Sequence, residues 1–79
     1  MPEKSMKLTD LKEGQKGIIF SIVGGRRVTQ RLTDMGLTPG IEIKMLRKGR
    51  WGPVEISVRG SNLALGHGVA RKILIKVKE

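Results

Sequence analysis

The sequence predicts a mainly β protein, a small barrel of about five short strands with one inserted α-helix and a short C-terminal helical turn. Three observations predict this fold. Apolar and polar residues alternate strictly over 54–58, as they do on a strand with one buried face. A clear helical spacing of apolar residues occurs in one stretch, 26–35. Glycine and proline punctuate the remaining short apolar runs.

The other elements follow at close spacing along the chain. Residues 1–7 are polar and are expected to form a frayed tail, while Leu8 and Leu11 are expected to cover the core. The almost continuously apolar run 18–23 predicts a strand that is buried on both faces. The remaining expected elements are strands at 41–46, 54–58, 63–65 and 73–77, and a short helical turn that opens at 66–68 and runs through 72.

The stretch from Arg31 to Gly40 ends the helix and starts the next strand. Val28, Leu32 and Met35 recur at i, i+4 and i+7, so they share one helix face. Gly36 stands where a left-handed residue ends a helix, and Leu32 and Leu37 are the apolar pair of a Schellman ending. Thr38, Pro39 and Gly40 then predict a type II turn.

The opposite face of the helix is basic. Arg26 and Arg27 lie near the positive end of the helix dipole, where positive charge is mildly unfavourable. Either this face is a binding surface that includes Arg27 and Arg31, or it is an ordinary solvated face. Arg31 and Asp34 also stand three residues apart, where they can pair.

A second basic segment, 47–53, contains the single tryptophan. Trp51 follows Arg50, and this pair of residue types is enriched among the side chains that anchor protein interfaces. The alternative is that Trp51 folds back over the mouth of the barrel as a core lid. Both readings stay open at this point.

The ordered series RLTDMGLTPG, VEISVRGSNLALG and HGVARKILIKV resembles the FeoA family, small cytoplasmic accessory proteins of bacterial ferrous iron uptake. The resemblance covers nearly the whole chain. It implies a single SH3-like domain over 1–79, with the helix as an insertion in the barrel. Similar modules also form the last domain of some metal-dependent repressors.

Composition limits the possible functions. The chain has 79 residues, no cysteine, and no apolar run that could act as a signal sequence or span a bilayer, so a cytoplasmic protein is expected. Its formal charge of +9 requires an acidic partner, which can be nucleic acid, an anionic membrane face or an acidic protein surface.

Neither a metal site nor an active site is expected. His67 is the single histidine, and the seven carboxylates are scattered without a ligand spacing, so no intrinsic cofactor is predicted. No nucleophile has an oriented base, and no phosphate-binding loop of the Walker type occurs, so the chain is not expected to be an enzyme.

Two binding hypotheses remain. The resemblance implies docking on the cytoplasmic GTPase part of the ferrous iron permease FeoB, with no small-molecule substrate, and contact with the membrane only through that partner. Arg27, Arg31, Arg50 and Trp51 are the candidate binding residues. The alternative is a basic nucleic-acid-binding module or a stand-alone relative of the repressor domain. One tryptophan and one phenylalanine are few for stacking on bases, which makes nucleic acid the weaker choice.

Overall fold

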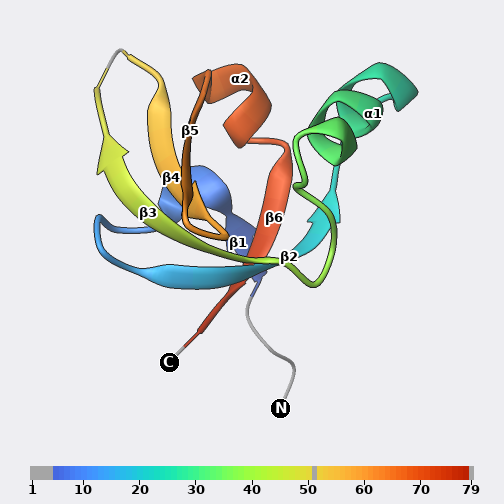
Figure 1. Cartoon of the computed structure of the whole chain (residues 1–79). Coiled ribbons are helices and arrows are strands. Elements are labelled where there is room, and N and C mark those ends of the chain that lie inside the picture. The colour runs from blue at the N-terminus through green and yellow to red at the C-terminus, as the bar shows by residue number, and fades with distance from the viewer. Residues whose placement is uncertain (1–4, 51, 79) are drawn as a thin grey trace.

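A single curled antiparallel sheet organises the chain (Figure 1). The structure is a computed structural model that describes residues 5–50 and 52–78. Its six strands lie in the order β1-β6-β2-β3-β4-β5. The strands are β1 (Ser5–Lys7), β2 (Lys16–Ile22), β3 (Glu42–Lys48), β4 (Val54–Val58), β5 (Ser61–Leu65) and β6 (Ile73–Val77). The helices are η1 (Leu8–Asp10), α1 (Arg26–Asp34) and α2 (His67–Ala70).

The core lies inside the curl of the sheet. The strictly alternating segment β4 buries Val54, Ile56 and Val58 on its inner face, as the period-two pattern predicted. Leu8 and Leu11 are fully buried, which confirms that they cover the core. The mainly β fold is therefore confirmed, although with six strands where about five were expected.

The prediction of a frayed tail over 1–7 is wrong for its second half. Ser5–Lys7 forms β1, which pairs with β6 so that Met6 lies opposite Ile75. The remaining residues of that predicted tail, 1–4, lie outside the described part of the chain. Met6 packs against the core, and this contact together with the backbone pairing holds the segment.

The prediction that strand 18–23 is buried on both faces is also wrong. Ile19 of β2 is buried, but Ile18 is 36% exposed and Phe20 is 48% exposed. An antiparallel sheet can leave one face in water, whereas a continuous apolar run is typical of strands covered on both faces. The outer face of β2 is therefore apolar and partly open to solvent.

Two boundaries also differ from the sequence-based expectation. β3 extends to Lys48, so the connection to β4 is shorter than the expected loop 47–53. α2 begins at His67, where the helical turn was expected to open, but ends at Ala70, before the expected end at Lys72. Among the described residues, no helix has both the length and the apolar character needed to cross a bilayer.

Candidate protein-binding site

The helix α1 carries two of the four candidate binding residues, Arg27 and Arg31. It begins after Gly25, which occupies the N-cap position and has no side chain to bond the first N–H groups of the helix. Leu32 is buried, Val28 is half-buried, and Met35 just beyond the helix is 40% exposed. The apolar stripe of this helix is thus only partly covered by the core.

The end of α1 has Schellman geometry. Gly36 has a φ of 86° and its N–H donates to the Thr33 carbonyl at 2.9 Å. The Leu37 N–H donates to the Leu32 carbonyl at 2.8 Å, and both leucine side chains are buried. These two bonds satisfy carbonyls that the helix end would leave unpaired, and the leucine pair fixes the helix on the core.

A type II turn then returns the chain to the sheet. Gly40, with a φ of 96°, follows Pro39, and the Ile41 N–H donates to the Thr38 carbonyl at 3.2 Å. The Gly40 N–H also donates to the Ile19 carbonyl of β2 at 2.8 Å. The turn that follows α1 is therefore bonded directly to β2, next to the start of β3.

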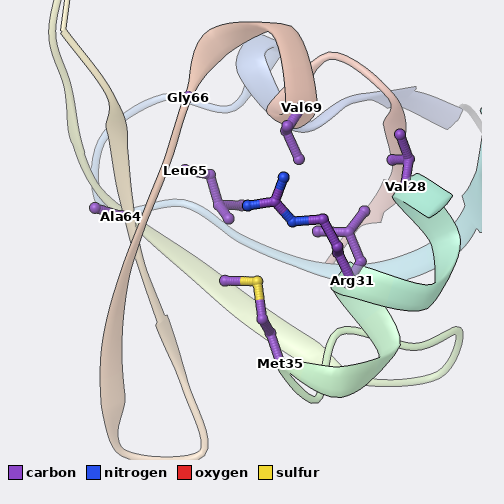
Figure 2. A pocket seen from close by; sticks show the side chains of 8 residues that line it. Val28, Arg31, Met35, Ala64, Leu65, Gly66 and Val69 are labelled. Carbon is purple, nitrogen blue, oxygen red and sulfur yellow. The ribbon is translucent and has the colours of Figure 1, made fainter.

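A groove of about 140 Å³ separates α1 from β5 and the start of α2 (Figure 2). Its walls are mostly apolar, and one guanidinium reaches into it. In Figure 2 the side chains of Arg31 and Met35 extend from α1 toward Leu65 and Val69 on the opposite wall. The groove is lined by Val28, Arg31, Leu32, Met35, Ala64, Leu65, Gly66 and Val69.

The possible pairing of Arg31 with Asp34 does not occur. The Asp34 carboxylate instead accepts a hydrogen bond from Gln30 Nε2 at 2.9 Å. The Arg31 side chain instead lies at the groove, and it also borders a shallow depression formed with Arg26, Arg27 and Gln30 on the same helix. The structure therefore brings Arg27 and Arg31 together on one exposed face of α1.

Of the second pair of candidate residues, Arg50 and Trp51, the structure describes only Arg50. Arg50 is exposed in the connection between β3 and β4, and Trp51 lies outside the described residues. In Figure 1 the ends of β3 and β4 that border this connection stand apart from α1, with α2 between them. The choice between an interface anchor and a core lid for Trp51 remains a prediction.

His67 connects α2 to this hairpin. Its Nε2 lies 3.0 Å from the Gly49 carbonyl oxygen, and since a carbonyl can only accept, Nε2 carries the proton. Within residues 5–50 and 52–78, no three potential metal-ligating side chains of His, Cys, Asp or Glu come together.

The ammonium group of Lys48 is bonded within the fold and does not face solvent freely. Its Nζ donates to the carbonyls of Thr9 and Leu11 at 3.0 and 2.9 Å, and its backbone N–H donates to the Glu13 carboxylate at 2.9 Å. These contacts join β3 to a segment more than thirty residues earlier in the chain. No pattern in the sequence indicates this role, because a lysine next to Arg47 in a basic run is typical of a solvated surface.

The curled antiparallel sheet with a helix inserted between β2 and β3 places the chain among small SH3-like domains. The structure of Stenotrophomonas maltophilia FeoA complexed with zinc, described as a procaryotic SH3 domain protein, has a TM-score of 0.78, with 90% of this chain and 89% of that chain covered at 22% identity. A manganese-dependent transcriptional repressor has a TM-score of 0.90 over 99% of this chain and 44% of that chain, at 14% identity. These two likenesses show the fold alone.

Sequence similarity then defines the family. The chain belongs to the FeoA domain family, whose model matches residues 6–77. It is 43% identical over 68 residues to a putative Fe(2+) transport protein A of Methanocaldococcus jannaschii, covering 86% of this chain and 82% of that protein. A crystal structure of an iron uptake regulatory protein, FeoA, is 37% identical with a TM-score of 0.90, covering 95% of this chain and 100% of that chain.

Proposed function

We propose that this chain is a cytoplasmic accessory protein of ferrous iron uptake that binds the GTPase domain of a FeoB-type permease through α1 and the adjoining groove. Membership of the FeoA family and the Fe(2+) transport name of the 43% identical relative support the transport role. The identity of the partner follows from the family resemblance.

The groove between α1, β5 and α2 is the main support for this binding surface. It combines apolar walls from Met35, Leu65 and Val69 with the guanidinium of Arg31. Such a site suits a partner segment that presents an apolar side chain next to a carboxylate, since Arg can bind a carboxylate through two parallel hydrogen bonds.

Titration calorimetry with a purified FeoB-type GTPase domain tests this proposal. We expect saturable binding that Arg31→Glu weakens by about 1–3 kcal/mol, because the variant places a carboxylate where the partner presents one. Lys12→Glu is the matched control, since Lys12 is exposed and lies outside the groove. It should bind like the parent apart from a small long-range effect of charge.

A random DNA duplex titrated in parallel tests the alternative function. Tight binding of the duplex with a steep salt dependence, together with no heat from the GTPase domain, would replace the accessory role with nucleic-acid binding.

A further inference from the structure

The outer face of β1, β6, β2 and the start of β3 collects positive charge. Cross-strand partners share a face of the sheet, and the pairing places Lys16 opposite Lys44 and Ile18 opposite Lys76. The Lys78 N–H donates to the Lys16 carbonyl at 3.0 Å, which extends the same row beyond β6. The lysines on this face are Lys7, Lys16, Lys44, Lys76 and Lys78, and it shares no residue with the groove beside α1.

One feature of this face, and one in the turn beside it, oppose the stability of the fold. Lys16 and Lys44 stand directly opposite each other on neighbouring strands, where like charges repel. Arg59 has a φ of 53° in the tight turn between β4 and β5, a conformation that suits Asn or Gly at that position. All three side chains border one hollow of about 390 Å³, together with Ser57. Unfavourable features that converge on one place indicate a function that uses them.

The one acidic residue within these four strands is already neutralised. Glu42 forms an ion pair with Lys78, and that hydrogen bond is the main cause that lowers the pKa of the carboxyl. Glu42 also lines the hollow, so an anion approaching there meets Lys16, Lys44 and Arg59 beside one carboxylate, which is already paired with Lys78.

Two exposed apolar side chains lie among the lysines. Ile18 and Phe20 project from the outer face of β2, with 36% and 48% of their surfaces exposed. The Lys76 ammonium lies 4.6 Å from the centre of the Phe20 ring. Apolar side chains surrounded by lysines are typical of surfaces that contact anionic lipid, where the apolar groups enter the interface and the lysines attract the headgroups.

We propose that this face binds an anionic phospholipid membrane, with the Lys16, Lys44 and Arg59 hollow receiving a headgroup phosphate and Ile18 and Phe20 entering the interfacial region. Nucleic acid fits less well, because a single phenylalanine offers no series of rings for stacking and a phosphate backbone would leave both apolar side chains in water. The proposal does not rest on the protein partner proposed above, since it concerns a different face.

Vesicle co-sedimentation tests the proposal. The full chain should bind vesicles of phosphatidylcholine mixed with phosphatidylglycerol, release them as salt rises, and bind pure phosphatidylcholine far more weakly. The double variant Lys44→Thr/Arg59→Asn should lose at least about tenfold in this binding. The same variant should melt at a higher temperature than the parent, because it removes the charge repulsion and relaxes the turn. If the double variant is more stable but binds vesicles less well, Lys44 and Arg59 serve binding and not the stability of the fold.

Two further variants and two further ligands complete the test. Lys12→Thr/Arg71→Gln removes the same charge at exposed sites outside the four strands of this face and should retain most of the vesicle binding. Phe20→Thr should weaken vesicle binding but leave any binding of inorganic phosphate or duplex DNA unchanged. The proposal is overturned if both kinds of vesicle bind equally, if the control variant loses as much as the double variant, or if only phosphate or the duplex binds.

Discussion

At the scale of single residues, Gly36 holds a backbone conformation that other residues adopt at a cost. Its φ is 86°, and a Cβ built at this position would meet no atom within 4 Å. Any loss of stability on substitution would therefore come from backbone strain and not from a steric clash. This makes Gly36 a clean measure of what the Schellman ending contributes.

We expect Gly36→Ala to lower the free energy of unfolding by about 1 kcal/mol, and Gly36→Val to lower it further because its β-branched side chain tolerates positive φ less well. Thermal melts of both variants measure the effect. Gly68→Ala is the control, since Gly68 also has open space for a Cβ but lies in α2 without a positive φ. It should be neutral or stabilising, and equal melting of all four proteins would contradict the role of the helix ending.

At the scale of elements, the sequence predicts segments whose signals are local. The strand β4 follows from strict alternation, and the end of α1 follows from the glycine and the two leucines around it. The order of elements from β2 to β6 is likewise as expected. Each of these depends on residues a few positions apart, which a sequence shows directly.

The elements that the sequence could not predict depend on distant partners. β1 has only three residues, and its pairing with β6 joins the two ends of the described chain. Lys48 is satisfied by carbonyls of Thr9 and Leu11, and the groove of α1 is closed by Leu65 and Val69. No periodicity in the sequence reveals such contacts, so the helix half of the candidate site was predictable and the β5–α2 half was not.

The pair of Glu42 and Lys78 links β3 to the end of β6 and depends on pH. The pKa of Glu42 is lowered, mainly by the hydrogen bond from Lys78 and then by the charges of Lys78 and Lys16. Because the folded protein holds the proton less tightly than the unfolded chain, the pair stabilises the fold at neutral pH. This contribution is lost as the pH falls through the lowered pKa.

We therefore expect Glu42→Gln to melt below the parent at neutral pH and to match it in acid. Melting temperatures measured across this pH range give the difference, which should be small because the pair is exposed. The same substitution in a Lys78→Met background is the control and should show a much smaller difference at neutral pH. A difference that persists undiminished in strong acid would show that the charge of Glu42 is not its cause.

At the scale of the whole molecule, we expect no stoichiometric iron or zinc. The chain has one histidine and no cysteine, and His67 already donates to the Gly49 carbonyl. A structural metal normally requires three or four converging ligands. Elemental analysis of the purified protein measures the content directly, and about one metal per chain that disappears in His67→Ala would contradict the prediction.

The candidate partner surface has two parts, one on α1 and one in the connection between β3 and β4. Arg27 and Arg31 share one face of α1, whereas Arg50 is exposed in the connection between β3 and β4, and Trp51, the next residue, lies outside the described residues. A partner as large as a GTPase domain can cover both, since a standard interface buries roughly 800 Å² on each protein. Variants at the two places therefore test whether the interface extends across α2.

If Trp51 is an interface anchor, Trp51→Ala should weaken binding of the GTPase domain by about 2 kcal/mol or more, with little change in melting temperature. If Trp51 is a core lid, stability and binding should fall together. Arg27→Glu should mainly slow association and reduce its salt dependence, because a charge at the rim of an interface acts on the encounter of the two proteins. Calorimetry at two salt concentrations, association kinetics and thermal melts of each variant give these quantities. Unchanged binding in both variants would restrict the interface to the groove itself, where Arg31 provides the charge.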